Sequence, residues 1–418
     1  MKKIYFIIFL TILTSNICFS QVIVDLSEYK FVDTVKNKLI VYNKSVYFDD
    51  FFNKIDTFLL EKKGKINVLH IGGSHVQGGF FTNSIRKNFD VLNGENTVSR
   101  GLTFPFKVAN TNNPKNFQVN FTGEWTSERN VTRTFSMPLG VAGIAVATND
   151  STATISVNLN TDSVMPHRSF TRLVLLGQNT DNQMITPIVF TNQKEYLPTS
   201  FDEKTNSYTY ELMEEADSFT LHFRNNDTLK HTFIVGGFIP ENDVQGIVYH
   251  EIGVNGAAVY SYLNCENFES ELNLIKPDLV VFGIGINDWV SSKMTEKEFI
   301  NNYTRLIEQI RGVSPHCAMI FITNNDSFRR VKVRRNHHTH FSYAVNTNGL
   351  RAQQTFYQLA KANDAAIWDL FSIMGGLRSM QKWEKAGLAA TDKIHFSAKG
   401  YELLGNLFFN ALMKAKNN

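Results

Sequence analysis

The pattern of apolar and polar residues changes twice along the chain. Between 48 and 100, an apolar run at 66–71 ends in Gly72-Gly73, and apolar residues at helical spacing follow from Phe80 to Phe89. A short continuous apolar run is typical of a buried parallel strand, and the spacing after it predicts a helix. We therefore expect this part of the chain to belong to an α/β unit.

From about 101 to 245 the period of the pattern becomes two. Apolar and polar residues alternate at 117–122, 155–160 and 219–224, and clusters of Asn, Asp, Thr and Gly separate these segments. Such segments predict an antiparallel β-sandwich, and the region is long enough to form a domain.

After 246, strand and helix patterns alternate again. Apolar runs at 278–283, 318–322 and 365–368 predict buried strands, while Thr295 with Glu298 predicts a capped helix start and another helix begins near Ser397. Alternating elements favour a parallel sheet with right-handed crossovers. The simplest architecture has an N-terminal segment at 21–47, then an α/β domain formed by 48–100 and 246–418. The β-sandwich at 101–245 interrupts that domain.

The first residues of the chain predict export, and the balance of charge limits the possible partners. Hydrophobic content of 43% and charged content of 19% over 418 residues describe a folded protein of about two domains. Lys2, Lys3 and the apolar run at 4–13 predict a signal peptide at 1–20, and no other run is long enough to span a membrane. Without Lys2 and Lys3, 40 basic residues face 39 acidic ones, a net charge of +1 that argues against nucleic acid as a partner.

Signal removal would leave Cys265 and Cys317. Both lie beside apolar runs, so we expect two buried thiols, while export leaves a disulfide between them open.

Four short segments carry the candidate chemistry. Each alone is typical of a turn or a helix cap, but in this order they supply a serine, amide donors and an Asp-x-x-His pair, as acyl-transfer hydrolases require. Ser74 and Asn287 follow buried strands, so they converge at one sheet edge with His395. Asp392 then accepts from one ring nitrogen of His395 while the other faces Ser74. The segments are Gly72-Gly73-Ser74-His75, Gly253-Val254-Asn255-Gly256, Gly285-Ile286-Asn287-Asp288 and Asp392-Lys393-Ile394-His395.

These segments resemble those of the SGNH (GDSL-like) hydrolase superfamily, over 48–100 and 246–418. The resemblance implies a flavodoxin-like three-layer α/β/α domain that needs no cofactor and no metal. It assigns Ser74 as nucleophile, His395 as base and Asp392 as the residue that orients the base. It also assigns an oxyanion hole to the Ser74 N–H, the Gly256 N–H and the Asn287 side chain. One departure is Gly73, where the family usually has aspartate.

The chain is more specifically similar to bacterial peptidoglycan O-acetylesterases. The similarity is carried by His75 after the serine, by Asn255-Gly256-Ala257, and by a sandwich like a carbohydrate-binding module inserted between the first two segments. It implies an exported serine esterase, periplasmic or extracellular, that removes O-acetyl groups from a polysaccharide, with peptidoglycan as the expected acetylated glycan. The alternatives are a lipid or thioester acylhydrolase of the same fold and a non-catalytic glycan-binding protein. The oligomeric state stays open.

Other features have competing interpretations. The basic stretch 329–335 with His337, His338 and His340 is expected to be a solvated loop near the active edge. A binding site for an anionic polymer is one alternative. A metal site is disfavoured because no carboxylate or cysteine ligands accompany the histidines. Trp289 either lines an acyl pocket or packs in the core. A further aromatic set fits the sandwich core or a sugar-stacking surface: Phe104, Phe106, Phe117 and Trp125.

Overall fold

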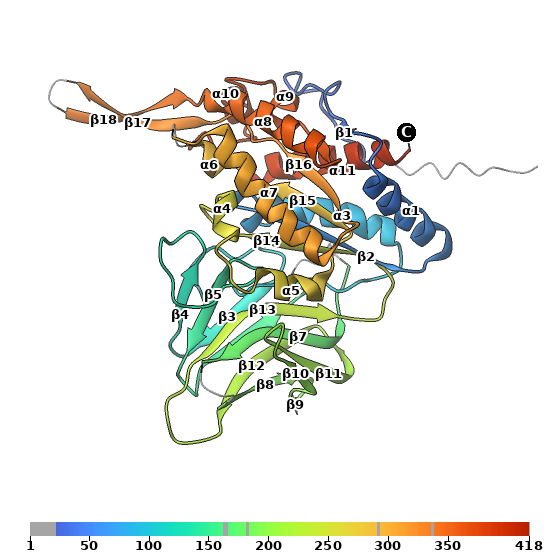
Figure 1. Cartoon of the computed structure of the whole chain (residues 1–418), viewed down its shortest axis with the longest axis vertical. Helices are drawn as coiled ribbons and strands as arrows, with labels where there is room; N and C mark the ends of the chain where they lie inside the picture. Colours follow the sequence, from blue (N-terminus) through green and yellow to red (C-terminus); the bar gives the residue numbers. More distant parts are fainter. Residues whose placement is uncertain (1–21, 162–165, 181–183, 291–292, 336–337, 418) are drawn as a thin grey trace, which may run out of the picture.

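The computed structural model describes residues 22–161, 166–180, 184–290, 293–335 and 338–417. The predicted signal peptide at 1–20 lies outside these residues. Figure 1 shows an α/β unit above a mostly β part, and a two-stranded hairpin that projects from the α/β unit.

A mostly parallel six-stranded sheet forms the centre of the α/β unit. Its order is β1-β19-β16-β15-β2-β14, with only β1 antiparallel to its neighbour. Counted along the chain, the five parallel strands have the order 2-1-3-4-5 of flavodoxin-like folds, as the sequence predicted. The strands are β1 (Leu39–Val41), β2 (Lys65–Gly72), β14 (Gly246–Gly253), β15 (Leu279–Gly283), β16 (Ala318–Ile322) and β19 (Ala366–Trp368).

Helices cover both faces of this sheet and complete the three layers. Alternate strand residues point to opposite faces, so Val280 packs with α5, α7 and α8, while Val281 packs with α1, α3 and α11. Thr295 caps α7 by accepting from the Glu298 N–H at 3.2 Å. The helices are α1 (Val46–Glu61), α2 (Ser74–Gln77), α3 (Phe80–Asn93), α4 (Val259–Tyr262), α5 (Phe268–Ile275), α6 (Ile286–Val290), α7 (Glu296–Val313), α8 (Asn348–Ala362), α9 (Leu370–Ile373), α10 (Met380–Lys385) and α11 (Ala398–Lys416).

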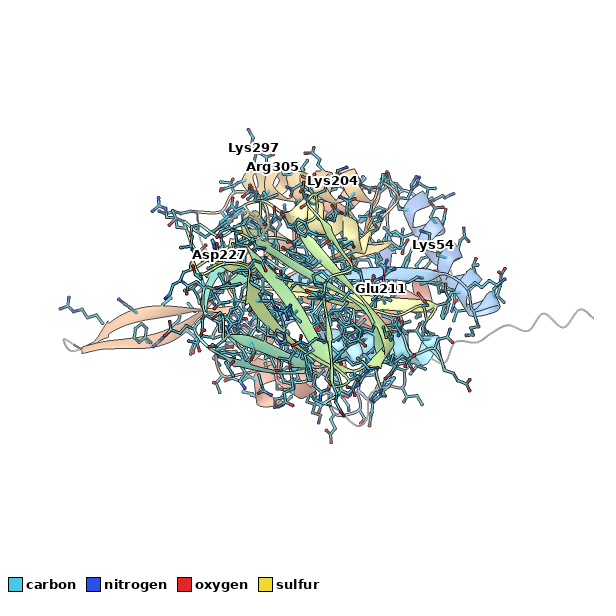
Figure 2. The ribbon with its side chains drawn as sticks, turned by 90° about the horizontal axis from the view of Figure 1, so that it is seen from below. Lys54, Lys204, Glu211, Asp227, Lys297 and Arg305 are labelled. Atoms are coloured by element: carbon cyan, nitrogen blue, oxygen red, sulfur yellow. The ribbon has the colours of Figure 1, made fainter. Side chains whose placement is uncertain are left out.

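Two antiparallel sheets form the inserted sandwich, as expected. Their orders are β10-β11-β7-β13-β5-β4 and β3-β6-β12-β8-β9. Charged side chains such as Glu211 of β11 lie on the outer surface (Figure 2). The strands are β3 (Gln118–Thr122), β4 (Thr126–Arg129), β5 (Ile144–Thr148), β6 (Thr154–Asn158), β7 (Phe170–Asn179), β8 (Ile185–Thr191), β9 (Lys194–Tyr196), β10 (Ser200–Asp202), β11 (Ser207–Ala216), β12 (Ser218–Asn225) and β13 (Phe233–Glu241).

The aromatic residues of the insert are mainly core residues. Phe104, Phe106 and Phe117 are buried, so they do not form a sugar-stacking surface. Trp125 is partly exposed, and its Nε1–H donates to the Thr122 carbonyl at 2.8 Å.

The two ends of the insert lie side by side. Thr103 and Phe238 form an antiparallel bridge, and the Asn242 side chain donates to the Thr97 carbonyl at 3.1 Å. The boundaries at 101 and 245 stay predictions, although β14 begins at Gly246.

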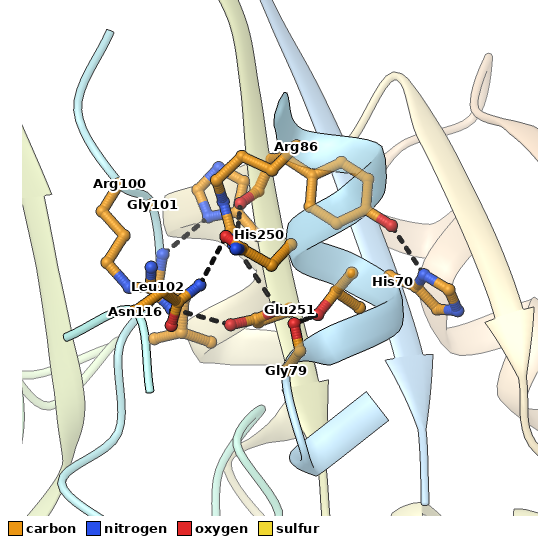
Figure 3. A network of polar contacts seen from close by, with 12 residues as sticks. His70, Gly79, Arg86, Arg100, Gly101, Leu102, Asn116, His250 and Glu251 are labelled. Carbon is orange, nitrogen blue, oxygen red and sulfur yellow. Dashed lines mark hydrogen bonds and ion pairs between the residues drawn. The ribbon is translucent and has the colours of Figure 1, made fainter. Parts of the chain in front are cut away.

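A buried network of charges in the α/β unit contacts the insert through Arg100, whose guanidinium donates to Asn116 Oδ1 of the insert at 3.0 Å (Figure 3). Glu251 of β14 pairs with Arg100 at 2.8 Å and with Arg86 of α3 at 3.4 Å, and all three side chains are buried. Burial raises the pKa of Glu251, but the two guanidinium groups outweigh burial and lower it. Glu251 therefore stays ionised as the counter-charge of two buried arginines.

The described part of the basic stretch is not the loop that we expected, and His337 lies outside the described residues. The stretch forms a hairpin of β17 (Phe328–Arg335) and β18 (His338–Val345), paired along its whole length. The physical reason is that Val331, Phe341 and Tyr343 have high strand propensity and outweigh the repulsion among the neighbouring cations.

Three smaller expectations are resolved. Cys265 and Cys317 are buried and unpaired, so the disulfide is excluded. Trp289 is buried and packs on Phe299 with 5.4 Å between ring centroids, which makes it a packing residue. Within the described ranges, no helix combines the length and apolar character that crossing a bilayer requires.

Candidate active site

Three of the four segments leave the sheet at one level. Gly72, the last residue of β2, pairs with Gly253 of β14 and with Gly283 of β15. In an open parallel sheet the carboxyl ends of the strands face one crevice. The loops that carry Ser74, Gly256 and Asn287 therefore begin on adjacent strands at the same edge.

Ser74, His395 and Asp392 form a continuous hydrogen-bonded chain. The Ser74 Oγ is 2.7 Å from His395 Nε2, and His395 Nδ1 is 2.7 Å from Asp392 Oδ2. The other carboxylate oxygen of Asp392 accepts the backbone N–H groups of Ile394 at 2.9 Å and of His395 at 3.0 Å. The four-residue segment thus holds its own carboxylate and imidazole in place.

The electrostatics of this chain favour one tautomer of His395. Partial burial raises the pKa of Asp392, but hydrogen bonds from the His395 ring and from the backbone N–H groups outweigh it, so the pKa lies well below its usual range. An ionised Asp392 accepts a hydrogen bond from the Nδ1–H group of His395. The Nε2 atom of His395 is then free to accept the Ser74 hydroxyl proton.

His75 supports the base from the other side. Its Nδ1 is 2.7 Å from the Tyr401 hydroxyl, and its ring centroid is 5.0 Å from that of His395. Burial, and then the neighbouring His395, lowers the pKa of His75 to about 3. His75 is therefore neutral at physiological pH and adds no charge beside the base.

Asn287 lies next to the residue that precedes Ser74. Its Nδ2–H donates to the Ala257 carbonyl at 2.9 Å, and a Cβ atom placed on Gly73 would lie 3.4 Å from Asn287 Nδ2. The backbone of Gly73 has φ −105°, which any residue adopts. Its φ value therefore does not require glycine, and an added Cβ would contact the Ala257 carbonyl and Asn287 Nδ2 at 3.4 Å.

The second segment is attached to the nucleophile helix. The Asn255 N–H donates to Gln77 Oε1 at 2.7 Å, and Gln77 belongs to the same short helix as Ser74. Gly256 is exposed and has φ +87°, a conformation that glycine adopts without strain. Gly256 is thus exposed to solvent on the loop that Asn255 attaches to the nucleophile helix.

Asp288 connects the second and third segments. Its carboxyl oxygens lie 3.2 and 3.1 Å from the Val259 N–H, and burial raises its pKa to about 7.

The structure brings together Ser74, His395, Asp392 and Asn287, with Gly256 on the adjoining loop. The sequence pattern did not single out Gln77 or the Tyr401 hydroxyl as site residues.

A groove of about 480 Å³ lies beside the site. Lys115, Asn116 and Thr161 of the insert line one side, and Phe80 and Glu402 of the α/β unit lie on the other. The Phe80 ring is 37% exposed and stacks on Tyr401, the partner of His75. Across the described part of the chain, no cluster of three or more His, Cys, Asp or Glu side chains forms a metal site.

Comparisons with known proteins bear on the fold. The GDSL-like lipase/acylhydrolase family model matches residues 217–403, so the match starts inside the predicted insert and does not include Ser74. A solved structure of a peptidoglycan O-acetylesterase is 20% identical, with a TM-score of 0.69, and the alignment covers 91% of this chain and 99% of that one.

Shorter matches cover one part of the chain only. An acetyl xylan esterase is 18% identical over 40% of this chain and 81% of its own, with a TM-score of 0.31. A lipase/acylhydrolase from Enterococcus faecalis is 23% identical over 41% and 77%, with a TM-score of 0.29. A search of curated proteins gives no match. The chain thus has the fold of an SGNH hydrolase with an inserted β-sandwich, and residues 217–403 are similar to the GDSL-like lipase/acylhydrolase family.

Proposed function

We propose that this protein is an exported serine esterase that removes O-acetyl groups from a polysaccharide, with peptidoglycan as the favoured substrate. The observation that carries the proposal is the chain of two 2.7 Å hydrogen bonds from Ser74 through His395 to Asp392. The polar groove between the insert and the site supports a glycan substrate, and so does the likeness to the peptidoglycan O-acetylesterase.

The proposed mechanism has two steps. The Ser74 Oγ attacks the ester carbonyl while His395 Nε2 takes its proton, and the Ser74 N–H, the Gly256 N–H and the Asn287 amide stabilise the oxyanion. The intermediate collapses as His395 protonates the departing sugar oxygen, which leaves as a hydroxyl, and acetyl-Ser74 remains. His395 then deprotonates a water molecule that attacks this ester, and it returns the proton to Ser74 Oγ as acetate is released. Asp392 stays ionised throughout and stabilises the imidazolium.

The lipid alternative is less well supported. The apolar cavity behind the nucleophile is about 40 Å³, room for only a few water-sized groups, and the larger groove beside the site carries Lys and Asn side chains. Neither of these two cavities is a long apolar channel.

The test combines labelling with substrate release. A fluorophosphonate probe should label Ser74, and acetate should be released from acetylated peptidoglycan faster than from acetylated xylan or from a triglyceride. Labelling at another residue would refute the nucleophile, and preferred release of a long acyl chain would refute the substrate class. Export is checked separately, by sequencing the N-terminus of protein recovered from outside the cytoplasm; we expect Gln21.

A further inference from the structure

One face of the β17–β18 hairpin is both basic and aromatic. Alternate residues of a strand point to the same side, and Arg330 pairs with Tyr343 while Lys332 pairs with Phe341, so these four share a face with Arg334. The Arg330 guanidinium lies 3.7 Å from the Phe341 ring centroid. Phe341 is 52% exposed and Tyr343 is 42% exposed. We call the five residues Arg330, Lys332, Arg334, Phe341 and Tyr343 the hairpin face.

The charge of the hairpin face is not compensated. The sequence contains no aspartate or glutamate between Asp326 and Asp364. In the part of the chain that the structure describes, Arg330, Lys332 and Arg334 take part in no ion pair. The whole chain is close to neutral, with a net charge of +3, so this face is a local concentration of positive charge.

The hairpin face is connected directly to the catalytic segment. The Phe328 N–H donates to the Lys393 carbonyl at 3.0 Å, and Lys393 lies between Asp392 and His395. The Lys393 ammonium is 5.7 Å from the Tyr343 ring centroid and 5.8 Å from that of Phe328. A polymer bound along the hairpin face would therefore pass the loop that holds the base.

We propose that the hairpin face binds an acidic glycan and guides it to Ser74. The proposal rests on the proposed function, because the bound polymer is the one whose acetyl groups are removed. Cations at alternate strand positions suit carboxylates repeated along a polymer, and exposed aromatic rings suit the apolar faces of sugars. An anionic membrane suits this face less well, because the Arg330 guanidinium, 3.7 Å from the Phe341 ring centroid, would have to enter the bilayer together with the ring.

The experiment measures binding to insoluble peptidoglycan sacculi, with the Ser74→Ala substitution in the full chain to prevent turnover. The test variant also carries Arg330→Gln, Lys332→Gln and Arg334→Gln. The matched control carries Lys204→Gln, Lys297→Gln and Arg305→Gln, three exposed cations on the main body (Figure 2). Both variants lose the same charge.

We expect the hairpin variant to bind sacculi roughly tenfold more weakly at low salt, because each exposed ion pair contributes only a few-fold. The control should bind like the parent, and added salt should reduce the difference between them. Phe341→Ser should weaken binding at every salt concentration, since its contact is not ionic.

Three results would overturn the proposal. These are unchanged binding by the hairpin variant, equal losses in both triple variants, and loss of binding to phosphatidylglycerol vesicles with sacculus binding intact. The last result would assign the face to a membrane surface instead.

Folding and catalysis are checked in the same hairpin variant with Ser74 retained, which should hydrolyse a small acetyl ester as fast as the wild type. A wild-type protein without any small-ester activity would contradict the proposed function, yet the sacculus binding comparison would still decide the role of the hairpin face.

Discussion

At the residue scale, the proposed nucleophile and base act as one unit, because neither side chain alone generates a reactive alkoxide. We predict that Ser74→Ala and His395→Ala each lower the esterase rate on the order of 10⁶-fold, and that the double variant is no worse. Rates with a chromogenic acetyl ester test this prediction. Full activity in Ser74→Ala would eliminate the assigned nucleophile.

Asn287 should matter less, since it stabilises charge without forming a bond. We expect Asn287→Ala to lower kcat by roughly 10²–10³ and to leave KM nearly unchanged, because the oxyanion develops only in the transition state. Steady-state kinetics measure both constants. Asn273→Ala, at an exposed position on α5, is the control and should behave like the wild type.

At the scale of elements, local pattern predicted most of the fold. The strands β2, β15 and β16 were predictable because each is a continuous apolar run, and α7 and α11 because Thr295 and Ser397 are recognisable caps. The β17–β18 hairpin was missed because basic residues at alternate positions also resemble a solvated loop.

The proposed site residues, like these elements, could be predicted from local patterns, whereas their hydrogen-bond partners could not. Ser74 and Asn287 follow apolar runs, and Asp392 lies three residues from His395. Tyr401 belongs to the buried side of α11, and the sequence pattern places it only in the core. Its contact with His75 joins residues 326 positions apart, and no local pattern encodes such a contact.

Glu271 of α5 couples the packing of the insert to pH. Its carboxyl accepts the Val141 N–H at 2.8 Å, and burial raises its pKa from 4.5 to about 8 despite that hydrogen bond. The folded state therefore keeps a proton that the unfolded chain releases above pH 4.5. The resulting stabilisation is complete below pH 4.5 and is lost as the pH rises to about 8.

The test compares Glu271→Gln, which keeps an acceptor for Val141 but cannot ionise. We predict that the wild type loses stability relative to this variant by about 1.4 kcal/mol per pH unit across the window. Urea unfolding at several pH values gives the two free energies of unfolding. Parallel profiles of unfolding free energy against pH for the two proteins would show that Glu271 does not titrate between pH 4.5 and about 8.

At the scale of the whole molecule, the buried Glu251 network stabilises the part of the α/β unit that contacts the insert through the hydrogen bond from Arg100 to Asn116. Glu251→Ala would leave Arg86 and Arg100 buried without a counter-charge, and we predict a loss of about 3–5 kcal/mol in the free energy of unfolding. The control is Glu211→Ala, whose pair with Arg172 is about half exposed and should contribute about 0–1 kcal/mol. Similar losses for both would contradict the prediction.

We predict that the groove makes the insert part of substrate binding for a polymer only. Lys115 lines the groove from the insert, so Lys115→Gln should weaken deacetylation of polymeric peptidoglycan several-fold while hydrolysis of a small acetyl ester stays intact. Lys204→Gln, at an exposed position of the insert that does not line the groove, is the control. Parallel losses on both substrates would mean that Lys115 is structural. No loss on either substrate would mean that the groove does not bind the substrate.

The bridge between Thr103 and Phe238 has a consequence for how the chain folds. Strand β2 pairs with β14 from Lys65 to Gly72, yet the entire sandwich separates the two strands in sequence. Closing a loop of that length costs conformational entropy, which falls once the sandwich has folded and brought its own ends together. The folded insert then holds the strands β2 and β14 close together. These two strands can therefore pair quickly only after the insert has folded. We infer an order of events during synthesis in which the nucleophile emerges early and the hydrolytic site is assembled last.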